Sequence, residues 1–166
     1  MNIILIGFMG AGKTSLARIL AKKLDFNYVD MDKIIIEKSG RKSDTEIFAK
    51  DGELAFREFE ILVANELKDE QNHVISTGGG IVMNKINLDY LKKNGVVVFL
   101  KSSFETAQKR ISKHNPPPLF RDLKKAKELY DLRLPLYTYY ADSIVETDDK
   151  SLDVIAEDTI KKIKSL

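Results

Sequence analysis

The chain is constrained most by residues 7–14, which read Gly-Phe-Met-Gly-Ala-Gly-Lys-Thr and satisfy the pattern G-x-x-x-x-G-K-S/T. An apolar, β-branched run precedes this segment and residues with helical spacing follow it, as the pattern requires. The backbone N–H groups of such a loop converge on phosphate oxygens, and the helix that follows adds a partial positive charge there. We therefore predict a nucleoside triphosphate site that comprises Gly10, Ala11, Gly12, Lys13, Thr14 and Ser15.

Two side chains of this loop have expected roles of their own. The Lys13 ammonium can reach the β- and γ-phosphates, and the Thr14 hydroxyl can ligate Mg²⁺. A glycine-rich turn without a ligand is the alternative for the segment. A dinucleotide-binding loop is disfavoured because the glycine spacing is not G-x-G-x-x-G.

Five short apolar runs alternate with segments of helical spacing. The runs are residues 3–6, 28–29, 74–75, 96–100 and 144–145. Helical spacing is clearest in residues 16–24, 56–67 and 152–163, and we expect two helical segments in the long connection between the second and third runs. This alternation predicts an α/β fold with a parallel sheet, helices on both faces and functional groups at the carboxyl ends of the strands.

Length and composition limit the class of protein. The 166 residues include 27 Lys+Arg and 25 Asp+Glu, a net charge of +2, which disfavours a dedicated nucleic-acid or membrane-surface protein. The length favours one domain. The lack of cysteine excludes disulfides, zinc–thiolate sites and thiol nucleophiles, and it fits a cytoplasmic location. We expect neither a signal peptide nor a membrane span.

Further candidate residues follow the second and third apolar runs. Asp30 and Asp32 come after the second run, where a period of two would point both carboxylates to one side, although one of them could be only a helix N-cap. The residues Gly78, Gly79 and Gly80 end the third run and would let a ligand approach the backbone closely, with a plain sharp turn as the alternative. Taken alone, Arg57 would be a solvated or ion-paired surface residue.

Together these segments resemble the shikimate kinase family. The resemblance rests on residues 7–14, Asp30-x-Asp32, Glu46-Ile47-Phe48 leading to Gly52-Glu53-x-x-Phe56-Arg57-x-x-Glu60, Gly78-Gly79-Gly80 and Arg133-x-Pro135-Leu136-Tyr137. It implies a three-layer α/β/α P-loop kinase fold with a central five-stranded parallel sheet. It also implies one domain, with a substrate-binding helical region near residues 31–60 and a mobile lid near residues 112–122.

The resemblance further implies an activity and a setting. The chain would phosphorylate the 3-hydroxyl of shikimate with ATP and Mg²⁺, giving shikimate 3-phosphate and ADP on the route to chorismate and aromatic amino acids. Its partners would be these small molecules, without nucleic acid or membrane, and it would be a cytoplasmic monomer.

Roles for single residues come from the same resemblance. Arg57, Arg133 and the glycine segment Gly78 to Gly80 would hold the carboxylate of shikimate, for which bidentate guanidinium geometry suits arginine better than lysine. Asp32 would bind the ring hydroxyls and orient the attacking one, which it could also deprotonate, while Asp30 would support Mg²⁺ together with Thr14. Phe48 and Phe56 are similar to the apolar wall of that pocket.

Arg110 is similar to the family residue that stacks on adenine, and residues 148–152 would supply the adenine loop. An exposed helical arginine is the alternative for Arg110. The tyrosines Tyr137, Tyr139 and Tyr140 are expected to belong to the core and the helix surface rather than to a binding platform.

The lid departs from the family pattern. The usual Arg-Pro-Leu sequence aligns with Pro117-Pro118-Leu119, so proline stands where an arginine reaches over the phosphates. The cations nearby are Lys113, His114 and Arg121. Arg121 is our predicted substitute because it lies at the foot of the lid, although it could merely start the following helix.

Two other functions stay open at this point. A gluconate or nucleoside monophosphate kinase would share the loop and the lid, but it is not expected to carry the paired aspartates, the triple glycine and the Arg133 motif together. A nucleotide-binding regulatory module without turnover is suggested by the missing lid arginine.

Overall fold

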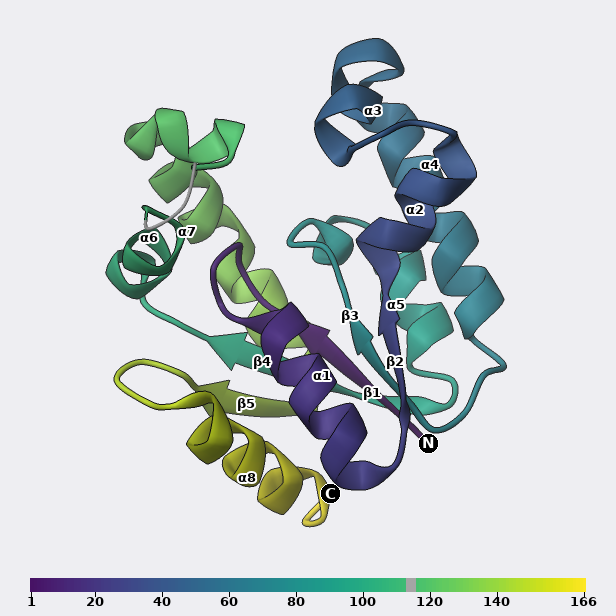
Figure 1. The fold of residues 1–166 in the computed structure, drawn as a ribbon, viewed down its shortest axis with the longest axis vertical. Helices are drawn as coiled ribbons and strands as arrows, with labels where there is room; N and C mark the ends of the chain where they lie inside the picture. Colours follow the sequence, from purple (N-terminus) through teal and green to yellow (C-terminus); the bar gives the residue numbers. More distant parts are fainter. Residues whose placement is uncertain (113–115) are drawn as a thin grey trace.

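A five-stranded sheet whose strands all run parallel forms the centre of the molecule (Figure 1). The computed structural model describes residues 1–112 and 116–166. The strands are β1 (Asn2–Ile6), β2 (Asn27–Asp30), β3 (His73–Ser76), β4 (Gly95–Lys101) and β5 (Ser143–Glu146). Each strand contains one of the five apolar runs, so this part of the prediction is confirmed.

The order of the strands explains where a ligand can bind. The sheet runs β2-β3-β1-β4-β5, so the chain first builds on one side of β1 and then crosses with β4 to the other side. Connections that diverge in this way open a crevice at the carboxyl end of the central strand, and ligands of open parallel sheets bind there. The glycine-rich loop, residues 7–14, leaves β1 at this crevice.

Neighbouring residues of β1 pack against opposite layers of helices, as the alternation of an extended strand requires. Ile3 and Leu5 belong to a core cluster with residues of α1 (Lys13–Leu24) and α8 (Leu152–Ile163). Ile4 and Ile6 belong to a second cluster with residues of α4 (Gly52–Leu67), α5 (Lys85–Leu91) and α7 (Leu123–Tyr140). Helices therefore cover both faces of the sheet, and the predicted three-layer arrangement is confirmed (Figure 1).

Three helices, rather than the two we expected, fill the connection between β2 and β3. They are α2 (Met31–Ser39), α3 (Asp44–Lys50) and α4. The chain leaves α2 at Gly40 with a left-handed φ of 68°, and the Ser43 side chain accepts a hydrogen bond from the Glu46 N–H to begin α3. The pattern missed α3 because its seven residues include only one that is buried, Ile47.

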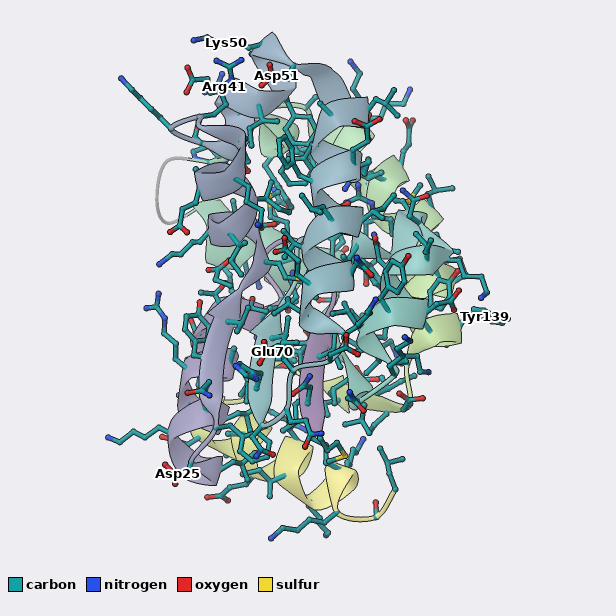
Figure 2. All side chains as sticks on the ribbon, turned by 90° about the vertical axis from the view of Figure 1, so that its right-hand side faces the viewer. Asp25, Arg41, Lys50, Asp51, Glu70 and Tyr139 are labelled. Carbon is teal, nitrogen blue, oxygen red and sulfur yellow. The ribbon has the colours of Figure 1, made fainter. Side chains whose placement is uncertain are left out.

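A bidentate ion pair closes the loop before α3. Arg41 donates through Nε and Nη2 to the two carboxylate oxygens of Asp51, at 2.8 and 2.7 Å. Both residues lie at the outer end of the α2–α4 region, as Figure 2 shows. The pair therefore ties the loop after α2 to the start of α4.

The segment expected to be a lid lies between α6 (Phe104–Ser112) and α7. Its described part includes a short 3₁₀ helix, η2 (Pro118–Arg121), and a second 3₁₀ helix, η1 (Ile81–Met83), follows β3. Phe120 is buried, with its ring 5.9 Å from that of Phe104 and 6.1 Å from that of Phe8 in the glycine-rich loop. This aromatic contact fixes the foot of the lid region beside that loop.

A search of the described helices finds none that is long and apolar enough to cross a membrane.

Candidate active site

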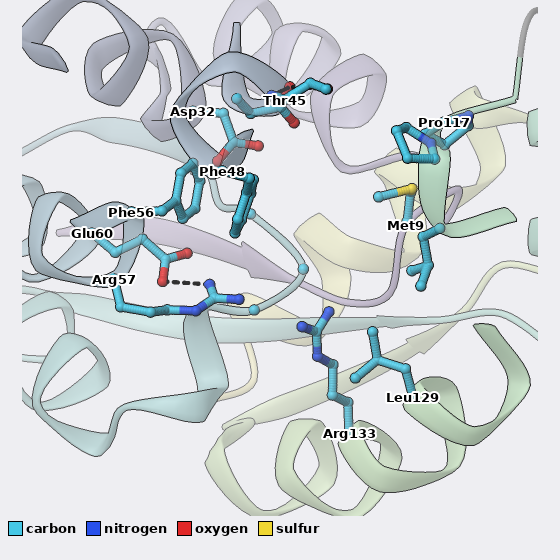
Figure 3. A pocket seen from close by; sticks show the side chains of 16 residues that line it. Met9, Asp32, Thr45, Phe48, Phe56, Arg57, Glu60, Pro117, Leu129 and Arg133 are labelled. Atoms are coloured by element: carbon cyan, nitrogen blue, oxygen red, sulfur yellow. Dashed lines mark hydrogen bonds and ion pairs between the residues drawn. The ribbon is translucent and has the colours of Figure 1, made fainter. Parts of the chain in front are cut away.

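Two cavities meet at the carboxyl ends of the central strands. The smaller, of about 300 Å³, lies over the glycine-rich loop and is lined by residues that include Gly10, Gly12, Lys13, Thr14 and Ser15. The larger, of about 460 Å³, is lined by residues that include Phe48, Phe56, Arg57, Glu60, Pro117, Leu129 and Arg133 (Figure 3). Met9, Asp32, Gly78 and Gly79 border both cavities. A molecule in the larger cavity would therefore lie next to a phosphate held by the loop.

The backbone of the glycine-rich loop is shaped for this role. Gly10 and Gly12 have φ values of 84° and 92°, which L side chains rarely adopt. Gly12 is also the N-cap of α1, so the N-terminus of this helix, a favourable place for an anion, lies at the smaller cavity. Ala11 contributes backbone alone, because its side chain is buried in the core with α1 and α8.

Lys13 is folded back onto the loop that precedes it. Its Nζ donates to the carbonyls of Gly7 and Phe8 at 2.8 and 3.1 Å, and the residue is buried. Burial lowers the pKa of Lys13 to about 8, although the carboxylate of Asp32 acts in the opposite direction. An ammonium group carries three N–H donors, so one of them stays available for a phosphate oxygen in the cavity.

Thr14 and Arg110 connect the loop to neighbouring strand ends. The Thr14 hydroxyl lies 3.3 Å from the Ser76 hydroxyl at the end of β3. Arg110, on α6, donates to the carbonyls of Gly10 and Ala11 at 3.3 Å and to the Thr147 carbonyl at 2.8 Å. Arg110 is therefore half-buried and joins the glycine-rich loop to the segment after β5, unlike the exposed helical arginine of the alternative interpretation.

Asp30 and Asp32 lie close together, but not for the reason that the sequence suggested. The strand ends at Asp30 and α2 begins at Met31, so the period of a strand does not place Asp32. Asp30 is the N-cap of α2: its carboxylate accepts from the Lys33 N–H and, at 3.0 Å, from the Tyr28 hydroxyl. This is the N-cap role that the sequence left open for one of the pair.

Asp32 has a different environment, in the first turn of α2. Its Oδ1 is buried and has no hydrogen-bond partner among the described residues. Burial raises the pKa of Asp32 to about 6; Lys13 opposes this change, and the charges of Asp30 and Asp44 add to it. A half-buried carboxylate at the border of both cavities is suited to bind a hydroxyl group that reacts with a phosphate.

Two arginines point into the larger cavity from different helices. Figure 3 shows the Arg57 guanidinium entering from α4 and the Arg133 guanidinium from α7. Both are half-buried, and Arg133 Nε has no partner among the described residues. Burial lowers the pKa of Arg133, and the charge of Arg57 adds to this effect. Two confined cations favour an anionic ligand, most of all a planar carboxylate.

Each glycine of the segment Gly78 to Gly80 faces one of these functional side chains. A Cβ on Gly78 would lie 2.8 Å from Asp32 Oδ1, and a Cβ on Gly79 would lie 3.5 Å from Arg133 Nη1. A Cβ on Gly80 would overlap the Arg57 guanidinium. Side chains of other elements thus leave no room for a Cβ at Gly78 and Gly80, whereas the contact at Gly79 would be an ordinary one. This requirement goes beyond the close ligand approach that we inferred from the sequence.

Glu60 belongs to the motif that carries the family resemblance, but sequence reasoning gave it no role in the site. It lies one turn after Arg57 on α4, is 1% exposed, and accepts a hydrogen bond of 2.7 Å from Arg57 Nη1 (Figure 3). Burial raises the pKa of Glu60, and the charge of Arg57 opposes this rise. Its spacing of three residues from Arg57 was the available signal, because such pairs share a helix face.

The remaining wall of the larger cavity is apolar. The rings of Phe48 and Phe56 stack with centroids 4.7 Å apart, which agrees with the wall that we expected. The sequence did not point to Met9, Asp44, Thr45, Leu119 or Leu129, which also line the cavity. They come from four separate segments, the glycine-rich loop, α3, η2 and α7, so no local pattern marks them.

The described part of the lid region contributes Pro117, Pro118 and Leu119 to the larger cavity. Arg121 is exposed, borders neither cavity, and has no hydrogen bond or ion pair among the described residues. It ends η2, and the N-cap of α7 is the following residue, Asp122. The other two cations considered, Lys113 and His114, lie outside the described residues.

Comparisons with known proteins all point to one family. A sequence model described as shikimate kinase matches residues 9–164. Shikimate kinase of Caldanaerobacter subterraneus subsp. tengcongensis is 42% identical, with 96% of this chain and 94% of that protein covered. Shikimate kinase of Thermodesulfovibrio yellowstonii is 39% identical, with 99% and 96% covered.

Solved structures give the same result. Shikimate kinase from Acinetobacter baumannii in complex with shikimate superposes with a TM-score of 0.91 at 35% identity, covering 99% of this chain and 93% of that one. The enzyme from Aquifex aeolicus superposes with a TM-score of 0.86 at 33% identity, covering 99% and 96%.

Proposed function

The chain belongs to the shikimate kinase family, and from its two adjoining cavities we propose how it carries out the ATP-dependent phosphorylation of shikimate. The observation that carries the proposal is the position of Asp32, which borders both cavities and lies opposite two arginines in the larger one. The product, shikimate 3-phosphate, leads to chorismate and the aromatic amino acids.

Shikimate is a carboxylate on a cyclohexene ring with three hydroxyl groups, and the larger cavity offers a partner for each part. The carboxylate binds between Arg57 and Arg133, beside the backbone of Gly79 and Gly80. The apolar edge of the ring packs against Phe48 and Phe56. Asp32 accepts hydrogen bonds from the ring hydroxyls, including the one that reacts.

ATP binds in the smaller cavity. The N–H groups of the loop from Gly10 to Ser15 hold the phosphates, and Lys13 provides an ammonium donor to the phosphate that is transferred. Arg110 lies between the loop and the segment after β5, where residues 148–152 would border an adenine ring that extends from the phosphates. Its contacts with Gly10 and Thr147 support its assignment to the nucleotide site.

The residues present fit Mg²⁺. No group of three or more His, Asp or Glu side chains in the described part of the chain could hold a metal by itself, and magnesium in phosphoryl-transfer sites is held by phosphates, water and one or two protein oxygens. The Thr14 hydroxyl would be the protein ligand, and the Asp30 carboxylate would add negative charge in support of the ion. When bound, the ion offsets negative charge on the β- and γ-phosphates.

Catalysis of this phosphoryl transfer depends on how the two substrates are positioned and on how the charge of the transferring group is stabilised, more than on covalent chemistry by the protein. The 3-hydroxyl oxygen of shikimate forms a bond to the γ-phosphorus, and the bond from that phosphorus to the β–γ bridging oxygen of ATP breaks. Asp32 orients the hydroxyl and receives its proton, for which it is ionised above about pH 6. Lys13 stabilises the charge that develops on the transferring group.

The lid region, residues 112–122, closes over the phosphates in this proposal, and Arg121 supplies the cation that Pro117 cannot. Arg121 has no partner to give up in the described part of the chain. An arginine side chain is long, and lid segments move when substrates bind. The region of residues 31–60 binds shikimate, within one domain.

The family also supports a monomeric cytoplasmic enzyme whose partners are small molecules. Size-exclusion chromatography of the purified chain tests the monomer directly; a dimer would contradict it.

A coupled assay of ADP release tests the function. We expect turnover with shikimate at least about 100-fold faster than with gluconate or a nucleoside monophosphate. Both competitors are anions that the two arginines could bind, but neither has a carboxylate, an apolar ring edge and a hydroxyl spaced to meet the arginines, the phenylalanines and Asp32 at once. ADP release that does not depend on shikimate would contradict the proposal, as would a chain that binds ATP without turnover.

A further inference from the structure

Tyr137 is a buried residue of α7 for which the proposed function gives no role. It is 1% exposed, and its ring stacks on Phe99 of β4 with the centroids 5.1 Å apart and the planes at 27°. Its hydroxyl donates a hydrogen bond of 2.5 Å to the carbonyl of Gly79. Because core packing immobilises the ring, the position of the hydroxyl is fixed as well.

The hydroxyl lies where the two parts of the carboxylate site meet. Arg133 and Tyr137 are four residues apart on α7 and therefore face the same side of the helix. A Cβ on Gly79 would lie 3.5 Å from Arg133 Nη1 and 3.7 Å from the Tyr137 hydroxyl oxygen. The guanidinium, the phenol and the glycine turn thus converge on one point at the wall of the larger cavity.

The chemistry of a phenol suits this place. A tyrosine hydroxyl has one proton, which it donates to the Gly79 carbonyl, and lone pairs that can accept from a donor such as the nearby Arg133 guanidinium. Burial raises the pKa of Tyr137 far above its usual value, against the effect of the Arg133 charge. The hydroxyl therefore stays protonated and donates throughout the pH range in which such an enzyme works.

We propose that Tyr137 is a positioning residue for the substrate carboxylate: its hydroxyl holds the Gly79 carbonyl and the Arg133 guanidinium in the arrangement that receives this group. The inference rests on the proposed function, since it takes shikimate as the ligand of the larger cavity. Loss of the hydroxyl leaves a carbonyl without its partner and frees the turn to shift. The loss of this hydrogen bond should weaken substrate binding rather than lower kcat, because the carboxylate of shikimate lies at a distance from the hydroxyl group that reacts.

The test is Tyr137→Phe, which keeps the ring on Phe99 and removes one oxygen atom. Tyr130→Phe is the matched control: Tyr130 is also buried on α7, and its hydroxyl donates to a backbone carbonyl, that of Ser102, at 2.7 Å, but it lines neither cavity. We expect Tyr137→Phe to raise the KM for shikimate about tenfold, with kcat within about threefold of wild type. Tyr130→Phe should leave the KM for shikimate unchanged.

Calorimetric titration with ADP and a thermal melt complete the experiment. Affinity for ADP should be equal in both variants, and the two melting temperatures should fall by similar amounts. An equal rise of the shikimate KM in both variants would reduce Tyr137 to a structural role and overturn the inference. A fall in kcat without a change in KM would also overturn it, because the hydroxyl would then act in the chemical step.

A second variant keeps the test decisive if Tyr137→Phe does not fold. Phe99→Leu retains the hydroxyl but removes the ring that holds it, so the KM for shikimate should rise in the same direction while ADP affinity is kept. An unchanged KM would contradict the inference. Wild-type turnover is measured in the same assay, so an inactive wild-type chain would refute the proposed function instead.

Discussion

Substitution of Gly80 by alanine tests whether the position of the Arg57 guanidinium matters for binding the substrate carboxylate. The variant keeps Arg57 in the chain but changes where its guanidinium can lie. A Cβ at this position would overlap the Arg57 guanidinium, whereas a Cβ on Gly79 would meet its nearest atoms at 3.5 Å, an ordinary contact. The backbone φ does not oppose alanine at either position, since neither glycine has a positive φ. In Gly80→Ala the tip of the Arg57 side chain must therefore move, because it is the flexible partner in the contact.

The expected loss follows from what the guanidinium does. A hydrogen bond to a charged group contributes about 1.5–3 kcal/mol, and about 1.4 kcal/mol corresponds to a factor of ten in affinity. Displacement of Arg57 should thus weaken shikimate binding about 10- to 150-fold. Gly79→Ala, which displaces nothing, should weaken it less than about threefold by the same conversion.

Isothermal titration of both variants with shikimate and with ADP measures the difference. ADP affinity should be equal in the two variants. The melting temperature of Gly80→Ala should fall by about 2–8 °C, because displaced Arg57 leaves the buried carboxylate of Glu60 partly unpaired at a cost of about 1–2 kcal/mol. Equal shikimate affinities in Gly79→Ala and Gly80→Ala would refute the reasoning, because Arg57 would then be dispensable for the carboxylate.

Three further predictions concern the catalytic groups. Lys13→Met should lower kcat by at least about 10²-fold through loss of charge at the transferring phosphate, and a melting curve near that of wild type would exclude unfolding as the cause. In wild type, kcat should fall as the pH drops below about 6, where Asp32 takes up a proton. Asp32→Asn should lower kcat and remove this acid limb without changing ADP affinity; an identical pH profile would show that another group titrates. Because the folded-state pKa of Asp32 is raised, its ionised form disfavours folding above that pKa, so Asp32→Asn should melt a few degrees higher than wild type at pH 8. Arg121→Ala should lower kcat about 10³-fold with little change in the KM for shikimate. Adding Pro117→Arg to the Arg121→Ala variant should restore much of the lost kcat. If Arg121→Ala does not change kcat, the cation at the phosphates must come from a residue outside the described part of the lid.

Much of the fold could be read from local patterns. The continuous apolar run Ile3 to Ile6 predicted a buried strand, and each of these residues lies in one of the two core clusters. The spacing within residues 7–14 likewise predicted the loop between β1 and α1. Such patterns are readable because they depend on the backbone geometry of a single element, which repeats every 2.0 or 3.6 residues.

The candidate site could be read only in part, and the limits have physical causes. Asp32 was expected beside Asp30 on an extended strand, but the N-cap hydrogen bond from Lys33 N–H to Asp30 begins the helix there. Helix α3 was missed because it buries a single side chain. Glu60 was quoted in the family motif but was given no role, because a carboxylate on a helix is normally solvated. Its ion pair with the Arg57 guanidinium makes its burial tolerable.

The sequence by itself determined the residue types and their order: a phosphate loop, five strands, two arginines and three successive glycines. Only the tertiary structure decided which of them meet. The strand order β2-β3-β1-β4-β5 brings the turn after β3 against α7, so Gly79 lies beside Tyr137 and Arg133, which come more than 50 residues later in the chain. These contacts depend on how whole helices and strands pack against one another. The free energy of that packing is distributed over the whole core and does not reside in any one segment of the sequence.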